Sequence, residues 1–416
     1  MNHINSLKKM CRDYKFRNFS ARFRRKVKVF AILILGGVII QCSPREKEPT
    51  MKINWGSLPD IPPAAEQPEQ KGLAGALVGI SSETLIVAGG SNFTDSLPWQ
   101  GGTKTYYDNI FFYNLSDSEK EWQIAEAKLP VSLAYSACVS VDDELICIGG
   151  ESQNGPLSCV LKLKLDNNDM QISTLTDFPE PVSNCGVARI GSVVYVAGGS
   201  GPQGHLSSFY CADVSKNVFK WEKLPDLPHP VSNAVVVSQW DGNENCIYVL
   251  GGRNKEGALT TFYSSVWKYS PSKKRWHQAG EITDNPKEPV TLAAGTGSAV
   301  SKNFILLLGG DNGKLYNKTE EFINAAAEAE TPGQKEEITN QKIKHLESHP
   351  GFSRQVFLYN TLTDECLQAS ELPFPAQVTT TAVKFENRIY IPNGEIRPGV
   401  RTSKVNFASL SGIRSE

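Results

Sequence analysis

The residues best suited to chemistry are a carboxylate and a guanidinium near the carboxyl end of the chain. They are Glu395 and Arg401, in the segment Asn393-Gly-Glu-Ile-Arg-Pro-Gly-Val-Arg-Thr402. The Pro398-Gly399 pair favours a turn that would bring both side chains to a common space. Beside Arg401, Glu395 would stay ionised at neutral pH and could act as a general base, while Arg401 could hold an acidic substrate bidentately. A salt bridge that only braces a loop is the alternative.

Internal repeats define the elements that must position this pair. A short apolar run that ends in Gly-Gly occurs five times, and a sixth copy ends in Asn-Gly, which tolerates the same left-handed turn. The copies occupy residues 85–90, 145–150, 194–199, 247–252, 305–310 and 389–394. Each unit predicts four short strands, and Trp122, Trp221 and Trp276 recur at the fourth. This pattern is typical of a kelch propeller blade, so the predicted fold is all-β, a six-bladed β-propeller.

Ring closure can be predicted from the two ends of the repeat array. The last repeat lacks a tryptophan-bearing fourth strand, and residues 53–59 supply one near the start of the chain. We therefore expect the amino-terminal strand to complete the last blade. Blades one and six are then neighbours, so the polar segment at residues 89–108 should meet the segment that carries Glu395 at one mouth of the ring.

The fifth repeat is oversized because of residues 315–351. Residues 319–330 and 336–346 are rich in helix formers and are separated by Pro332-Gly333. The sequence therefore predicts a helical insertion in blade five, which would emerge beside one mouth of the channel. A lid, a dimer contact and a solvent-exposed insertion without a function are all compatible with this position.

The amino-terminal segment has the composition of an export signal. Residues 1–41 hold ten of the 43 Lys and Arg but one of the 44 Asp and Glu, and they include a twelve-residue apolar run, residues 29–40. Cys42 follows at once, as in a bacterial lipoprotein signal, although Gln41 replaces the usual small residue. We expect a signal peptide at 1–41, lipidation at Cys42, a flexible tether at 42–51 and the propeller at 52–412. A plain signal peptide cut elsewhere and an uncleaved anchor are the alternatives.

Charge and motif content exclude several classes of function. The chain after residue 41 has a net charge of −10, which argues against general nucleic-acid binding. The seven cysteines after Cys42 form no CxxC pair and lie mostly in apolar strand-like runs, so we interpret them as core residues. The histidines have no metal-ligand spacing, and no phosphate-binding loop stands in a suitable context. We expect neither a metal nor an organic cofactor.

The 393–402 segment resembles a motif of the sialic acid mutarotases, kelch propellers that interconvert the anomers of N-acetylneuraminate. Their Asn-Gly-Glu-x-Lys-Pro-Gly-x-Arg-Thr is matched here except that Arg397 replaces the lysine. The resemblance extends over most of residues 52–412, with the blades in the order of a cyclically permuted branch. It implies that Glu395 is the catalytic acid/base and that Arg401 is its partner.

The same resemblance implies further contacts and a location. Arg401 would hold the sugar carboxylate, and Lys104, Asn92, Gln100 and Tyr106 are candidates for contacts to hydroxyl or N-acetyl groups, although each could equally serve the loop itself. The expected ligand is a small acidic sugar, the expected place is the periplasm or the outer membrane, and the only membrane contact is the lipid anchor. A homodimer is compatible with the sequence. The competing hypothesis is a non-catalytic kelch module that binds a glycan or a protein at the same mouth.

Overall fold

The structure is a computed structural model that describes residues 51–64, 67–116, 121–216, 219–284 and 287–411. The expected signal peptide, Cys42 and nearly all of the tether lie outside these residues. Within the described ranges, neither helix combines the length and the hydropathy that a membrane span requires.

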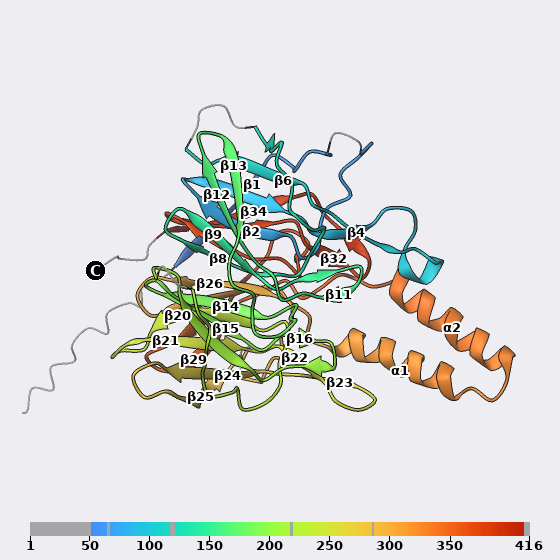
Figure 1. The fold of residues 1–416 in the computed structure, drawn as a ribbon. Coiled ribbons are helices and arrows are strands. Elements are labelled where there is room, and N and C mark those ends of the chain that lie inside the picture. The colour runs from blue at the N-terminus through green and yellow to red at the C-terminus, as the bar shows by residue number, and fades with distance from the viewer. Residues whose placement is uncertain (1–50, 65–66, 117–120, 217–218, 285–286, 412–416) are drawn as a thin grey trace, which may run out of the picture. The chain divides into compact units, whose positions relative to one another are not determined.

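Six four-stranded antiparallel sheets form the blades of the propeller (Figure 1). Blade one holds β2 (Leu77–Ser81), β3 (Thr84–Ala88), β6 (Ile110–Asn114) and β7 (Gln123–Ile124). Blade two holds β8 (Ala137–Val141), β9 (Glu144–Ile148), β12 (Val160–Asp166) and β13 (Asp169–Thr174). Blade three holds β14 (Gly186–Ile190), β15 (Val193–Ala197), β18 (Phe209–Asp213) and β19 (Glu222–Lys223).

The remaining blades repeat this order from the channel outwards. Blade four holds β20 (Val235–Trp240), β21 (Asn245–Leu250), β24 (Ser265–Ser270) and β25 (Arg275–Glu281). Blade five holds β26 (Thr296–Val300), β27 (Phe304–Leu308), β28 (Gln355–Asn360) and β29 (Glu365–Glu371). Blade six holds β30 (Val383–Phe385), β31 (Arg388–Pro392), β34 (Val405–Ser411) and β1 (Lys52–Leu58). The predicted six-bladed propeller is confirmed.

Blade six is completed by the first strand of the described chain. β1 lies antiparallel to β34 along its whole length, from Lys52 opposite Ser411 to Leu58 opposite Val405. Trp55 of β1 packs edge-on against Phe374 of the neighbouring region of blade five, with ring centroids 5.5 Å apart. The prediction that the amino-terminal strand closes the ring is confirmed.

The blades are held together by apolar side chains that each blade cannot bury alone. One core cluster combines Ile86 and Phe112 of blade one with Leu145 and Leu161 of blade two, and all four are at most 4% exposed. Tryptophans of the outer strands add polar links, since Trp276 donates its indole N–H to the carbonyl of Pro225 in the preceding blade, at 2.9 Å. Each blade therefore depends on its neighbours for a complete core.

A closed circle of backbone hydrogen bonds lines the central channel. One residue just before the inner strand of each blade adopts a left-handed conformation, with φ between 52° and 64°, and donates its N–H to the equivalent carbonyl of the preceding blade at 2.7–3.0 Å. We call these residues the inner ring: Gly75, Tyr135, Asn184, Asn233, Ala294 and Thr379. The circle closes where Gly75 donates to Thr379, so the channel is framed by main chain from all six blades.

Small hairpins follow the glycine turns and project from one end of the ring (Figure 1). They are β4 (Ser91–Phe93) with β5 (Lys104–Tyr106), β10 (Glu151–Ser152) with β11 (Gly155–Pro156), β16 (Ser200–Gly201) with β17 (Gly204–His205), β22 (Arg253–Lys255) with β23 (Thr260–Phe262), and β32 (Glu395–Arg397) with β33 (Val400–Arg401). A short 3-10 helix, Pro98–Gln100, lies between β4 and β5. We call this end of the channel the hairpin mouth.

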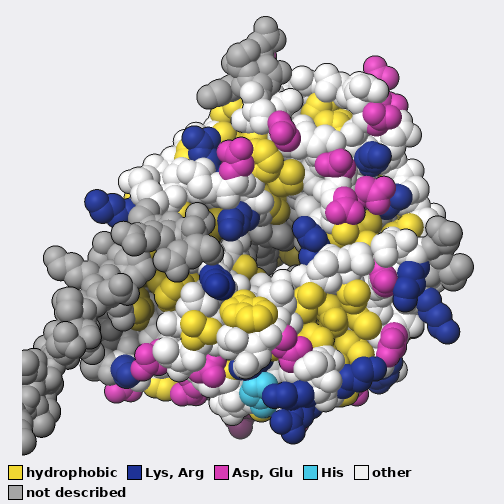
Figure 2. All heavy atoms as spheres, turned by 90° about the vertical axis from the view of Figure 1, so that its left-hand side faces the viewer, with side chains coloured by type: hydrophobic (Ala, Val, Ile, Leu, Met, Phe, Trp, Pro, Cys, Tyr) yellow, Lys and Arg dark blue, Asp and Glu magenta, His cyan; other side chains and the backbone are white. Residues whose placement is uncertain are grey.

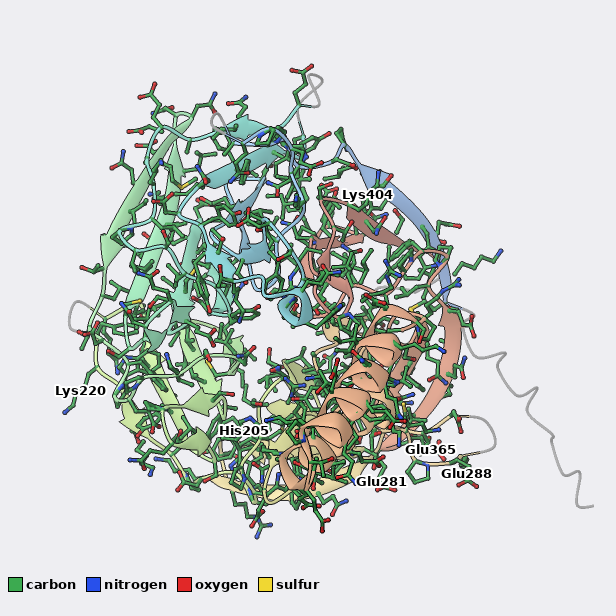
Figure 3. The ribbon with its side chains drawn as sticks, turned by 90° about the vertical axis from the view of Figure 1, so that its right-hand side faces the viewer. His205, Lys220, Glu281, Glu288, Glu365 and Lys404 are labelled. Atoms are coloured by element: carbon green, nitrogen blue, oxygen red, sulfur yellow. The ribbon has the colours of Figure 1, made fainter. Side chains whose placement is uncertain are left out.

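In blade five, two helices replace the small hairpin. They are α1 (Lys314–Glu328) and α2 (Pro332–Glu347), and they stand beside the opening of the channel (Figure 3). The predicted insertion is confirmed, but Pro332-Gly333 is not a break between the helices. Thr331 caps α2 and Pro332 occupies its first turn, where a missing N–H costs nothing.

Candidate active site at the hairpin mouth

The sequence-predicted pair lies on the small hairpin of blade six. Glu395 of β32 stands directly opposite Arg401 of β33, and Glu395 Oε2 lies 3.2 Å from Arg401 Nη2. The other carboxylate oxygen, Oε1, accepts the N–H of Gly399 in the turn at 2.8 Å. The Pro398-Gly399 turn therefore brings the two side chains together, and the same contacts brace the hairpin.

The pKa of Glu395 is raised above its usual value of 4.5, mainly because burial disfavours the charged carboxylate. Arg401, the N–H of Gly399, Lys104 and Arg253 act in the opposite direction. The expectation that Arg401 sets the ionisation of Glu395 was therefore incomplete, since burial outweighs it. A carboxylate with a raised pKa is better suited to exchange protons near neutral pH than an ordinary surface glutamate.

Arg401 is enclosed by the hairpin of blade one. Its guanidinium stacks on the ring of Phe93 in β4, 4.7 Å from the centroid, and its side chain is 4% exposed. Nε and Nη1 are buried and have no hydrogen-bond partner among the described residues. A Cβ placed on Gly399 would lie 2.9 Å from Leu97 Cδ2, so the turn of blade six packs on the 89–108 segment. The two polar segments therefore meet, as predicted from the closed ring.

Lys104 and Tyr106 converge on a carboxylate that was not predicted. Glu151 of β10 in blade two accepts the Tyr106 hydroxyl and lies 3.3 Å from Lys104 Nζ. Burial disfavours the charged form of Lys104, but Tyr135, Glu151 and Tyr106 together raise its pKa above the ordinary value. Burial and the hydrogen bond to Glu151 raise the pKa of Tyr106 to about 12. This cluster spans blades one and two at the hairpin mouth.

Asn92 and Gln100 are engaged in the structure of the loop. The Asn92 amide donates to the carbonyl of Gly72 at 3.0 Å and accepts the Tyr107 hydroxyl at 2.8 Å. Gln100 is exposed, and its side-chain oxygen accepts the N–H of Leu97 at 3.3 Å. The side-chain oxygens of both residues are therefore used within the loop.

The pseudo-sixfold arrangement identifies equivalent positions around the candidate site that the sequence analysis missed. The residue that follows each glycine turn forms an antiparallel bridge to the segment before the inner strand of its own blade. These residues are Ser91, Glu151, Ser200, Arg253, Asp311 and Glu395, which we call the post-glycine ring. Glu395 is therefore one of six equivalent positions around the hairpin mouth. These six positions could have been found from the sequence, because each residue directly follows a Gly-Gly or Asn-Gly pair.

The central channel also holds a cavity, and the residues that line it do not include Glu395, Arg401 or Arg253. A cavity of about 530 Å³ runs along the inner strands and is bounded by residues of all six blades, among them Gly75, Asn184 and Thr379. On the opposite face of the propeller the surface is also hollowed at its centre (Figure 2). No cluster of three or more His, Cys, Asp or Glu side chains suited to a metal ion occurs within the described ranges.

Comparison with known proteins places the chain in a family. The model of the family described as N-acetylneuraminate epimerase matches residues 45–172 and 175–415. The chain belongs to the N-acetylneuraminate epimerase family. Both hairpins of the candidate site, in blades one and six, lie within the matched residues.

Individual members of the family are moderately similar to this chain. An N-acetylneuraminate epimerase of Salmonella typhimurium is 32% identical over 162 residues, which cover 38% of this chain and 40% of the relative. One of Brucella suis is 29% identical over 141 residues, covering 30% and 34%. The aligned part of this chain therefore covers two fifths or less of the length of each of these curated relatives. The solved structure of YjhT shares the fold, with a TM-score of 0.58 at 14% identity, over 85% of this chain and 99% of that one.

Proposed function

We propose that this protein is a cofactor-independent mutarotase that interconverts the α and β anomers of N-acetylneuraminate. The observation that carries the proposal is the half-buried Glu395 at the mouth of a channel, paired with Arg401 and within the electrostatic influence of Lys104 and Arg253. Membership of the N-acetylneuraminate epimerase family supports the choice of sugar.

The reaction needs one group that can both accept and return a proton. Glu395 would take the proton of the anomeric hydroxyl while the bond from the anomeric carbon to the ring oxygen breaks and that oxygen gains a proton, directly or through water. The open-chain keto acid rotates, and the ring closes on the other face as the protons return. Burial raises the pKa of Glu395 and so makes its protonated form easier to reach, which suits a group that must also return a proton.

Positive charge at the mouth supports an acidic ligand. Arg401, Lys104 and Arg253 come from blades six, one and four, and each lowers the pKa of Glu395. They act in a chain whose portion after residue 41 has a net charge of −10. A local cluster of cations on an acidic body is suited to a specific small anion.

The decisive experiment follows freshly released α-N-acetylneuraminate by NMR. We expect the wild-type protein to accelerate its conversion over buffer, and Glu395→Gln to lose about 10²- to 10⁴-fold of that acceleration. The matched control is Glu371→Gln, an exposed carboxylate at the end of β29. No acceleration by the wild type, or full activity in Glu395→Gln, would refute the catalytic role and leave a non-catalytic propeller that binds its ligand at the hairpin mouth.

We also propose that the protein is exported and anchored through a lipid on Cys42. The support is the basic and apolar composition of residues 1–41 and the position of the cysteine directly after the apolar run. Mass spectrometry of the membrane-extracted protein should find an acylated cysteine at the new amino terminus. Cys42→Ala should release the protein from membranes with its folded propeller intact. Membrane retention of this variant would contradict the lipid anchor.

A further inference from the structure

Arg253 occupies the post-glycine position of blade four and is half-buried. It is the first residue of β22, and its backbone exchanges hydrogen bonds of 2.9 Å with Ser232. The equivalent residue of blade six is Glu395. By this equivalence, the side chain of Arg253 starts at the same level of the hairpin mouth as the carboxylate proposed to move protons.

The guanidinium of Arg253 is held in place without using its hydrogen-bond donors. It stacks on the ring of Tyr316 in α1, 4.7 Å from the centroid, and Tyr316 in turn packs edge-on against Phe262 of β23. No carboxylate of a described residue lies within the 4.0 Å of an ion pair, and the side chain makes no hydrogen bond within the described part of the chain. Stacking covers one face of the guanidinium and leaves the N–H groups at its edge for a ligand.

Helix α1 is itself fixed to blade four, which makes this platform rigid. The carboxylate of Glu320 accepts the backbone N–H of Thr260 at 2.6 Å, the Thr260 hydroxyl at 2.9 Å and Lys255 Nζ at 2.8 Å. Asn324 donates to the carbonyl of Ala258 at 2.9 Å. The helical insertion therefore contacts Arg253 at the hairpin mouth through the ring of Tyr316.

The other two cations near Glu395 are committed elsewhere. Arg401 contacts Glu395 itself, and its unpartnered nitrogens are closed to solvent beneath Phe93. Lys104 is paired with Glu151. The charge of Arg253 is close enough to lower the pKa of both Glu395 and Asp311, yet Arg253 forms an ion pair with neither. Arg253 therefore keeps its hydrogen-bond donors free at the same mouth of the ring as Glu395.

We propose that Arg253, held by Tyr316, binds the carboxylate of the sugar acid and so presents the anomeric hydroxyl to Glu395. In a keto-sugar acid the carboxylate and this hydroxyl are attached to the same anomeric carbon, so one group can contact Arg253 while the other contacts Glu395. This assignment rests on the proposed function and moves the carboxylate contact from Arg401 to Arg253. Arg401 then acts as the partner that adjusts Glu395.

The test compares N-acetylneuraminate with its methyl ester, which keeps the ring and loses the negative charge. Binding of each is measured by NMR titration, and anomer exchange is measured in the same samples. We expect the wild type to bind the acid about tenfold or more tighter than the ester. Arg253→Met should bind both equally, and Tyr316→Leu should lose most of the preference while Tyr316→Phe keeps it. Because the two ligands meet the same Glu395 in each variant, a changed Glu395 pKa does not alter this comparison.

Two further variants separate the roles. Arg401→Met should keep the preference for the acid while its anomer exchange slows measurably at neutral pH, and Lys335→Met, which removes an exposed charge from α2, should behave as wild type. A wild-type preference for the acid that persists in Arg253→Met, or equal binding of acid and ester by the wild type, would overturn the assignment. Discriminating binding without anomer exchange would overturn the proposed catalysis and leave the role of Arg253 standing.

Discussion

The chemistry of Glu395 depends on a balance between burial and neighbouring positive charge. Burial raises its pKa, whereas Arg401, the N–H of Gly399, Lys104 and Arg253 lower it. Arg401 is the strongest of the opposing influences. The guanidinium therefore limits the rise of the Glu395 pKa and favours the ionised form that acts as a base.

Removing Arg401 should shift the pH dependence of catalysis. A base works only when it is deprotonated, so the rate of anomer exchange should fall on the acidic side as pH drops through the Glu395 pKa. In Arg401→Met this acidic limb should move to higher pH, because the influence that lowers the pKa is lost. The profile of kcat/KM against pH measures the shift, and Arg401→Lys, which keeps a positive charge, should move it less. An unshifted limb in Arg401→Met would show that another group is being titrated.

At this scale the sequence predicted the pair but not its surroundings. The short separation of Glu395 and Arg401 across a Pro-Gly turn is local information, so their contact could be predicted. The stacking of Arg401 on Phe93 and the capture of Lys104 by Glu151 join segments from different blades. Such contacts depend on the exact placement of neighbouring hairpins, which the residue types alone do not specify.

The helical insertion starts at a glycine that no other residue can replace without strain. Gly313 precedes α1 with φ of +81°, and a Cβ there would lie 2.5 Å from the Phe262 ring. Phe262 is the residue on which Tyr316 packs. The close approach of Gly313 to Phe262 thus lies where α1 leaves blade five and also beside the Tyr316 ring that stacks on Arg253.

Two glycine substitutions in the same insertion should have opposite effects. Gly313→Ala should cost about 1 to 3 kcal/mol through the positive φ and the clash with Phe262. Gly333→Ala should be neutral or stabilise by up to about 1 kcal/mol, because this residue lies in the first turn of α2 with open space around its Cα. Chemical denaturation measures both, and limited proteolysis shows whether the insertion loosens first. Equal effects of the two substitutions would contradict this account.

Sequence composition located the helices but not the contacts that hold them. Runs of helix formers in residues 319–330 and 336–346 were enough to predict two helices. The capping of α2 by Thr331 and the docking of α1 through Glu320 rest on single residues within a polar stretch. Such a polar residue belongs to no periodic pattern in the sequence, so it cannot be distinguished there from neighbouring polar residues that face solvent.

The whole propeller is a circle in which every blade completes its core against the next. The inner ring of backbone hydrogen bonds and the pairing of β1 with β34 close this circle. The repeated glycine turns and the missing fourth strand predicted this architecture, because each repeat carries its own copy of the signal. The inner ring was not predicted, since it includes residues as different as Gly75, Tyr135 and Ala294.

Weakening the closing strand should destabilise the ring as a unit. Trp55→Ala removes the ring that packs on Phe374, and we expect a loss of about 2 kcal/mol or more in the free energy of unfolding. Lys52→Ala, at an exposed position of the same strand, should change it by less than about 0.5 kcal/mol. Chemical denaturation should show one transition that moves in Trp55→Ala. A separate early transition would show that blade six unfolds independently.

The pairing of β1 with β34 also imposes an order in time. β1 is synthesised before the other described strands, and β34 is the last of them. While the ribosome is still adding blades, β1 has no partner and could pair with another chain. Blades one to five can assemble one after another, but the two open strand edges disappear only when residues 405–411 emerge. The chain is therefore most vulnerable to aggregation while β1 still lacks β34 as its partner.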